Sequence, residues 1–243
     1  MIDPMPDPAD IDLDQTDRIA ELAKIPPGDR DGVWLGEFLS AVPTAAFRVA
    51  EKETARGPDG FHYLLFFLPP RDVEFHGFSV RSVLDVCLSK GLGIAIYPEA
   101  EDKPVFVLNY GHLWSYKSTG AFDSRPPGEL TPNLPPPAAL GPGATDRVTV
   151  GAPSESYFPS WARNVVRDYL KLNGVGTPRA ALAADADGKR PRSLLFNVYR
   201  EDYPSDEHFR ELLIRLTWYF PPHYAIQPLV KRGTSVDELL EPF

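Results

Sequence analysis

Residues 79–97 read SVRSVLDVCLSKGLGIAIY, and this stretch predicts an amphipathic helix followed by a buried strand. Five apolar side chains recur in it at the spacing i, i+3, i+4, i+7 and i+8, which places them on one helix face: Val80, Val83, Leu84, Cys87 and Leu88. Gly91 is a suitable helix stop, because glycine readily adopts the left-handed conformation that ends many helices. The apolar run from Gly93 to Tyr97 that follows is typical of a strand.

A similar pattern occurs twice in the chain. In the first half, the run Leu64-Leu65-Phe66 corresponds to Ile94-Ala95-Ile96, with a helical pattern between them. In the second half, Leu194-Leu195-Phe196 corresponds to a run that starts at Ala225-Ile226, again with a helical pattern between them. Each half is therefore predicted to contain a β-β-α-β core, and we expect an α+β fold of two similar lobes. Each lobe should have a mixed or antiparallel sheet packed with helices on one face. Chance alignment of two common strand patterns is the alternative.

The remaining elements are predicted from helical and strand periodicity and from turn residues. In the first half we expect helices over 18–24 and 33–42 and strands over 46–51, 62–68 and 105–108. The segment 111–117 is either a short helix or an irregular cap. In the second half we expect strands over 147–150, 180–184, 193–199 and 224–228, with helices that start at Pro159 and Ser205.

Proline divides the chain into parts. The stretch 125–143, RPPGELTPNLPPPAALGPG, contains seven prolines, and proline lacks the backbone donor that helices and central strands need. We therefore expect a proline-rich linker at 125–143, between an N-terminal α+β lobe at 14–124 and a C-terminal α+β lobe at 144–243. Residues 1–13 are predicted to form a disordered acidic tail, because their prolines disfavour regular structure and their aspartates make them acidic.

The charge of the chain limits its partners. The formal net charge is −9, which argues against nucleic-acid binding, because phosphate recognition needs an excess of lysine and arginine on one face. Six aspartates precede Arg18, the first basic residue, so the rest of the chain carries only −3. We therefore expect a nearly balanced body with an acidic, solubilising tip.

Cysteine use and hydropathy bear on the compartment. Cys87 is the only cysteine, so no disulfide can form within the chain. No apolar stretch approaches the roughly 18 residues of a membrane span, and the N-terminus lacks the basic start and apolar run of a signal peptide. These features predict a cytoplasmic protein with no membrane partner.

No catalytic, metal-binding or nucleotide-binding motif stands out. The chain lacks a P-loop and a Gly-x-Ser-x-Gly elbow, and its five histidines are not spaced as metal ligands. We therefore predict no cofactor and no metal, and the sequence favours a protein that is not an enzyme. The alternative is an unrecognised hydrolase or transferase that uses His112 or His223 with nearby carboxylates.

Polar aromatic residues gather around the segment NYGHLWSY, residues 109–116. We identify the following as a candidate binding site: Tyr97, Tyr110, His112, Trp114 and Tyr116. Lying next to the predicted linker, these side chains could line a groove for an extended peptide. The alternative is that they pack the linker against the core. This alternative is favoured, because aromatic side chains contribute a large buried area wherever they occur.

Several segments combine turn prolines with apolar strands in a recognisable order. They are 38–47, 103–107, VTVGAPSE at 148–155, the helix that starts at Pro159, and the strands at 179–183 and 194–198. In this order the chain resembles the SseB-like (enhanced serine sensitivity) proteins of bacteria, over most of its length. The resemblance implies a two-lobed α+β architecture, but no catalytic residues, because the family has no established activity.

These features lead to one function prediction and two alternatives. We expect a bacterial cytoplasmic, non-enzymatic module that binds a protein or a peptide. The first alternative is an adaptor or an immunity or antagonist protein of a secretion or toxin system, in which an acidic chain would bind a basic target. The second is the unrecognised enzyme. Exposed edge strands could also pair between chains and form a homo-oligomer.

Overall fold

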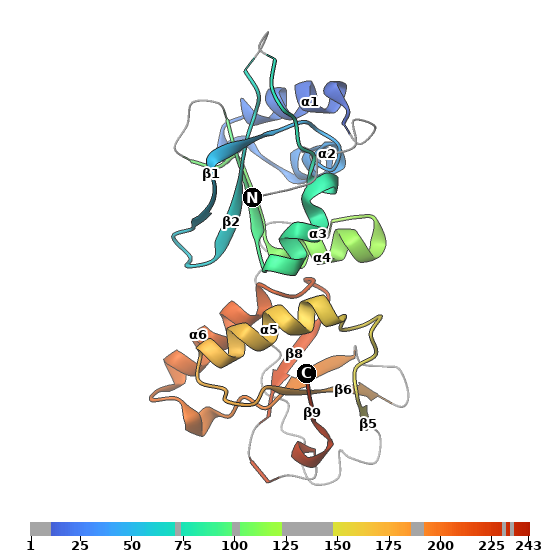
Figure 1. The fold of residues 1–243 in the computed structure, drawn as a ribbon, viewed down its shortest axis with the longest axis vertical. Coiled ribbons are helices and arrows are strands. Elements are labelled where there is room, and N and C mark those ends of the chain that lie inside the picture. The colour runs from blue at the N-terminus through green and yellow to red at the C-terminus, as the bar shows by residue number, and fades with distance from the viewer. Residues whose placement is uncertain are drawn as a thin grey trace. The chain divides into compact units, whose positions relative to one another are not determined.

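The computed structural model describes residues 11–70, 74–98, 103–122, 148–185, 192–229, 232–233 and 236–243. The chain divides into two compact units, residues 1–130 and 131–243 (Figure 1). The predicted linker at 125–143 lies outside the described residues, and so does the predicted tail up to residue 10. None of the described helices combines the length and apolar character that a membrane crossing requires.

Unit 1 contains four α-helices and a mixed four-stranded sheet among its described residues. The elements are α1 (Leu13–Ala23), α2 (Gly32–Ala41), β1 (Arg48–Arg56), β2 (His62–Phe67), α3 (Val80–Lys90), β3 (Gly93–Tyr97), β4 (Phe106–Leu108) and α4 (Tyr110–Thr119). The strand order is β1-β2-β3-β4. β2 and β3 are parallel, as a crossover through α3 requires, and the other neighbours are antiparallel.

Unit 2 contains two α-helices and a mixed sheet of five strands among its described residues. The elements are β5 (Val148–Gly151), α5 (Ser160–Leu172), β6 (Arg179–Asp185), β7 (Ser193–Phe196), α6 (Asp206–Thr217), β8 (Ala225–Pro228) and β9 (Glu241–Pro242). The strand order is β5-β6-β7-β8, with β7 and β8 parallel and the short β9 paired with β6.

The predicted duplication of a β-β-α-β core is confirmed. The succession α2-β1-β2-α3-β3 in unit 1 recurs as α5-β6-β7-α6-β8 in unit 2, and the sheets are mixed. Leu64 pairs with Ile94, as the predicted correspondence requires. Leu194 pairs with Ile226 rather than with Ala225, so the predicted correspondence is one residue short. The paired residues are 30 positions apart in unit 1 and 32 apart in unit 2, and the longer connection does not change the topology.

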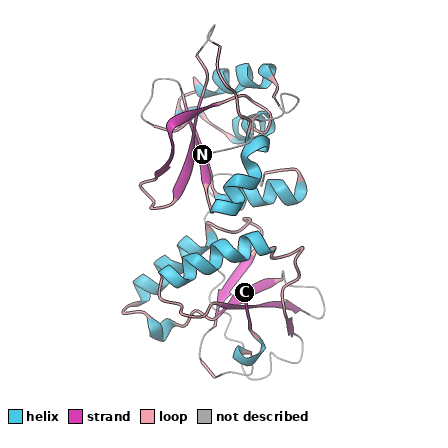
Figure 2. Ribbon diagram, viewed as in Figure 1, coloured by secondary structure: helices cyan, strands magenta, loops and turns pink. Residues whose placement is uncertain are grey.

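In unit 1 the helices gather on one side of the sheet (Figure 2). Phe66, Ile96 and Phe106 lie in one row across β2, β3 and β4, and their side chains point to the same face. The ring of Phe38 in α2 lies 4.9 Å from that of Phe106, and Phe47 stacks on Phe66. We call the opposite side the helix-free face of unit 1.

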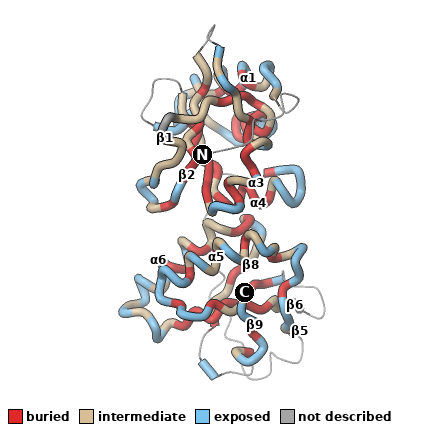
Figure 3. The backbone as a smooth tube through the Cα atoms, viewed as in Figure 1, coloured by how far each residue is buried: buried red, intermediate tan, exposed pale blue. Residues whose placement is uncertain are grey.

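In unit 2 the helices α5 and α6 cover one face of the sheet (Figures 1 and 3). Phe196 of β7 meets Phe158 and Phe220 there, at centroid distances of 6.1 and 5.8 Å. The opposite face is covered by the first part of the C-terminal segment, residues 236–240, whereas Phe243 at its end packs on Phe158 and Phe196 on the helix side. Val236 and Leu240 of this segment are buried in one apolar cluster with residues of the sheet and its flanking loops, Ala181, Leu195, Tyr199 and Leu229.

The structure corrects the boundary of the predicted tail and confirms the helix alternative for the segment 111–117. α1 starts at Leu13, and the Asp12 carboxylate caps it by accepting hydrogen bonds from the backbone N–H groups of Asp14 and Gln15. Residues 11–13 therefore belong to a capped helix start rather than to the acidic tail. The segment around 111–117, predicted as a helix or a cap, is the helix α4, with Asn109 as its N-cap.

Candidate functional site

Three residues of the predicted aromatic site are buried in unit 1. The exposed fraction is 0% for Tyr110, 1% for Trp114 and 7% for His112. The Tyr110 hydroxyl donates to the carbonyl oxygen of Leu88 in α3 at 2.9 Å. Tyr110 and Trp114 lie one helical turn apart and share the helix face that packs inward. The prediction that these three residues line an exposed groove is therefore wrong, because the surrounding fold covers them.

The other two residues of that predicted site keep some exposed surface but do not meet in one groove. Tyr97 ends β3 and stacks on Phe67 of β2, at a centroid distance of 5.2 Å. Tyr116 lies in α4 and stacks on Phe122 at 4.6 Å. They belong to different surfaces of unit 1, and only Tyr97 lies on the helix-free face.

The histidines of the enzyme alternative have structural partners. The His112 ring nitrogen Nδ1 accepts a hydrogen bond from the Asn109 N–H at 3.3 Å, while the Asn109 side chain accepts from the His112 N–H at 2.7 Å. This reciprocal pair is a capping box, which engages the ring in capping the start of α4. The ring of His223 packs against that of Tyr224, edge to face at 4.9 Å. Neither contact is one that activates a catalytic base.

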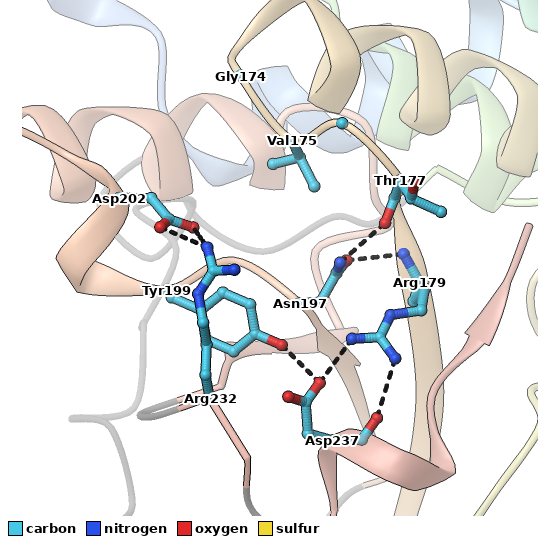
Figure 4. Close-up of a pocket in the computed structure, with 10 residues that line it drawn as sticks. Gly174, Val175, Thr177, Arg179, Asn197, Tyr199, Asp202, Arg232 and Asp237 are labelled. Atoms are coloured by element: carbon cyan, nitrogen blue, oxygen red, sulfur yellow. Dashed lines mark hydrogen bonds and ion pairs between the residues drawn. The ribbon is translucent and has the colours of Figure 1, made fainter.

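A polar cleft of about 370 Å³ lies in unit 2, where β7 and β8 end and β6 begins (Figure 4). Its wall is formed by the loop 174–177, by Arg179 and Asn197, by Tyr199 and Asp202 after β7, and by Arg232 and Asp237. The carboxyl ends of parallel strands are a common place for ligands in open sheets, since the chain leaves the sheet there in loops.

Asn197 joins the two sides of the cleft. Its side-chain amide donates to the carbonyl oxygen of Thr177 at 2.8 Å, and its side-chain oxygen accepts from the N–H of Arg179 at 2.7 Å. Gly174 opens the loop 174–177 with φ of 91°, a conformation that favours glycine. The loop after α5 is thereby held against the end of β7.

Asp237 is the centre of the charged network in the cleft. One carboxylate oxygen accepts from the Tyr199 hydroxyl at 2.5 Å and from Arg179 Nη2 at 2.8 Å, and the other accepts from the Gly233 N–H at 3.1 Å. Burial opposes ionisation of Asp237, but the Tyr199 and Gly233 hydrogen bonds and the Arg179 charge outweigh it and lower its pKa. Burial, and then donation to Asp237, raise the pKa of Tyr199 to about 12.

Arg232 closes the other side of Tyr199. Its guanidinium lies over the Tyr199 ring, 4.6 Å from the centroid, and donates to both carboxylate oxygens of Asp202 at 2.5 Å. Glu201 lies 3.3 Å from its Nε. Each arginine of the cleft thus faces a carboxylate, and the Arg179 partner, Asp237, comes from the C-terminal segment. The cleft holds a chain segment by its acidic side chain.

Sequence reasoning missed this cleft. Arg179 starts β6 and Asp237 lies close to the end of the chain, so no local spacing joins them. The one available signal was an acidic pair, Asp237 and Glu238, between the apolar residues Val236 and Leu239. An acid in an apolar setting often has a buried partner, but the sequence does not say which arginine it is.

The described residues outside this cleft meet neither the requirements of a metal site nor those of a cysteine nucleophile. In the part of the chain that the structure describes, no three His, Cys, Asp or Glu side chains gather as a metal site. Cys87 is buried in unit 1, and burial raises its pKa to about 12. The thiol is therefore protonated and weakly nucleophilic.

Fold and site together define a duplicated α+β protein in which one sheet face of unit 2 holds an apolar and acidic chain segment. Comparisons of the chain with protein-family models, with curated proteins and with solved structures found no match. The resemblance to the SseB-like proteins stays a prediction.

Proposed function

We propose that this chain is a non-enzymatic module that binds a protein or a peptide. One observation carries the proposal: unit 2 already holds a peptide segment, its own residues 236–242, which lies on the face of the sheet that helices leave free and then pairs along the edge of β6. Because unit 1 repeats the β-β-α-β core of unit 2, the corresponding face of unit 1 is a candidate site for a second peptide segment.

Three kinds of contact hold the C-terminal segment in unit 2. Val236 and Leu240 supply buried apolar surface, and Asp237 supplies the carboxylate for Arg179. β9 adds backbone pairing along the edge of β6, where Ala180 faces Glu241. Apolar anchors, a charged anchor and strand pairing are also the contacts by which many domains recognise extended peptides.

The helix-free face of unit 1 retains exposed surface. Four side chains on this face are half-buried: Leu65, Phe67, Tyr97 and Val107. On the covered face of the same sheet, Phe66, Ile94 and Ile96 are completely buried, and Phe106 at the edge strand is half-buried. Half-buried apolar and aromatic side chains on one sheet face are typical of an interaction surface.

Affinity capture with matched variants tests the proposal. The tagged chain is used to capture partners from lysate of its source organism at low and moderate salt, alongside the variants Val107→Glu and Val33→Glu. Val33 is 68% exposed in α2, away from the helix-free face, and serves as the control. We expect one stoichiometric partner with the wild type and with Val33→Glu, and a loss of about tenfold or more with Val107→Glu, because a charge would be buried at the contact.

Folding and alternatives are checked in the same experiment. Circular dichroism must show the same secondary structure for both variants, and Tyr97→Ser provides a second, uncharged change on the same face. A partner that Val107→Glu and Tyr97→Ser capture as well as the wild type does would contradict a binding role for this face. Capture of no protein by any of the four chains would contradict the binding function itself.

A further inference from the structure

The duplication places two arginines at the same position in the two sheets. Arg48 is the first residue of β1 and Arg179 is the first residue of β6, and these are the corresponding hairpin strands of the two units. Arg48 pairs with Phe67, which points away from the helices. Arg179 lies two positions before Ala181 and so shares its helix-free face.

The two arginines differ in their partners. Arg179 pairs with the Asp237 carboxylate of the C-terminal segment at 2.8 Å. The Nε of Arg48 is buried and has no hydrogen-bond partner within the described structure. A guanidinium stays charged at every physiological pH, and buried N–H groups almost always have an acceptor. Among the described residues, Arg48 therefore lacks the kind of carboxylate that Arg179 has.

Aromatic and apolar side chains continue from Arg48 across the sheet. Phe67 and Tyr97 lie in the same row as Arg48, on β2 and β3, and their rings stack 19° from parallel. Leu65 and Val107 lie one step further along the same face. In unit 2 the matching surface, formed by Ala181 and Leu195, is covered by Val236 and Leu240.

We infer that the helix-free face of unit 1 binds an extended segment of a partner protein in which an acidic residue lies among apolar residues. The partner carboxylate pairs with Arg48, and the apolar side chains pack on Phe67, Tyr97 and Val107. This inference rests on the proposed function and names the chemistry of the partner. The partner segment would resemble the C-terminal segment that unit 2 already binds, in which Asp237 lies between Val236 and Leu240.

The acidic residue of the partner is selected by its direct contact with Arg48 and not by long-range electrostatic attraction. Residues 131–243 contain 13 basic and 13 acidic residues, so the whole net charge of −9 lies in unit 1. An acidic segment gains nothing from that overall charge at a distance. The buried donor of Arg48 is the reason to expect a carboxylate, and exchange of Arg48 is the most direct test.

A synthetic peptide with the sequence of residues 232–243, RGTSVDELLEPF, is a suitable probe. Its binding to the full-length chain is measured by chemical-shift changes in amide NMR spectra. A control peptide carries amides in place of its three acids, Asp237→Asn, Glu238→Gln and Glu241→Gln. We expect shifts at Leu65, Phe67 and Val107 with the acidic peptide, and affinity about tenfold lower with the amide peptide, as for the loss of one charge-assisted hydrogen bond.

The matched protein variants are Arg48→Gln and Arg56→Gln. Arg56 is exposed at the other end of the same strand, so its exchange removes one positive charge without touching the proposed contact. We expect Arg48→Gln to reduce affinity for the acidic peptide about tenfold and Arg56→Gln to leave it unchanged. The free Arg48→Gln chain should unfold at the same temperature as the wild type or higher, since no described acceptor is lost.

The outcomes separate this inference from the proposed function. If the peptide binds at the helix-free face and Arg48→Gln does not weaken this binding, the proposed role of the carboxylate is wrong. The proposed function as a binding module would still stand. Shifts confined to Ala181, Leu195 and their neighbours would show exchange with the segment of unit 2 and would overturn the inference. A clear loss of stability in free Arg48→Gln would mean that Arg48 has a partner within the chain, which would also overturn it.

Discussion

Asp237 links three segments of unit 2 through one carboxylate. Tyr199 follows β7, Arg179 starts β6, and the Gly233 N–H precedes the C-terminal segment, and all three donate to Asp237. Its side chain is only 13% exposed, so water replaces these donors poorly. Because the carboxylate has charge-assisted hydrogen bonds in a shielded site, it should contribute more to stability than an exposed ion pair does.

The exchange Asp237→Asn is therefore expected to lower the free energy of unfolding of unit 2 by about 1.5–3 kcal/mol, the usual worth of hydrogen bonds to a charged group. Tyr199→Phe, which removes one donor and keeps the ring, should cost less, about 1 kcal/mol. The stability of both variants is measured by urea unfolding, with amide hydrogen exchange of unit 2 residues as the readout. Equal stability of Asp237→Asn and the wild type would mean that the C-terminal segment is held by its apolar contacts alone.

The same carboxylate should make the stability of unit 2 depend on pH. The folded pKa of Asp237 lies below its ordinary value of 3.8, so the unfolded chain takes up the proton first as the pH falls. The stabilisation is complete above the ordinary value and is lost as the pH falls through the folded pKa. Asp237→Asn should therefore show a smaller loss of stability between about pH 5 and pH 2 than the wild type.

At the scale of single elements, Gly93 in β3 and Gly36 in α2 differ in the space around them. A Cβ on Gly93 of β3 would lie 2.7 Å from the carbonyl oxygen of Leu108 and 2.7 Å from the Tyr63 ring. A Cβ on Gly36, exposed in the middle of α2, would meet nothing within 4 Å. Gly93 allows β4 and Tyr63 to approach β3 closely, whereas Gly36 has no such contact.

Exchange of the two glycines by alanine should thus have opposite effects. Gly93→Ala should destabilise unit 1 by about 1–3 kcal/mol, because backbone and ring must both shift. Gly36→Ala should stabilise it by roughly 0.5–1 kcal/mol, because glycine costs about that much in a helix interior. Thermal unfolding of the two variants beside the wild type measures both. A stable Gly93→Ala would show that Tyr63 moves aside freely.

At the scale of the whole molecule, each unit has a sheet and a buried core of its own. The core of unit 1 includes Trp114, Phe66 and Ile96, and that of unit 2 includes Phe158, Phe196 and Leu216. Since each core is formed within one unit, a change in one core should be felt first in that unit.

The variant Trp114→Ala tests this independence. Truncation of a fully buried tryptophan should cost unit 1 about 3–5 kcal/mol. Hydrogen exchange read by mass spectrometry should then show faster exchange in α3, α4 and β3, with unchanged exchange in β6, β7 and α6. Equal acceleration in both units would mean that they unfold as one cooperative body.

Local pattern predicted most of the elements of this fold. The apolar spacing from Val80 to Leu88 defines α3, and the runs at Leu64 and Ile94 define two adjacent parallel strands. The error at Leu194 and Ile226 arose because register depends on how the chain turns between strands. The predicted aromatic site failed for a related reason: the spacing of Tyr110 and Trp114 shows that they share a helix face, but not that the face is covered.

The sequence by itself determined the secondary structure, the β-β-α-β duplication and the absence of a standard catalytic motif, because all three depend on residues that are close together in the chain. Only the tertiary structure decided which sheet face each unit leaves free and which arginine receives a carboxylate. Arg179 and Asp237 lie far apart in the chain and meet only in the folded unit, and Arg48 lacks such a partner among the described residues. Contacts of this range depend on how segments cross the sheet, which periodicity does not encode.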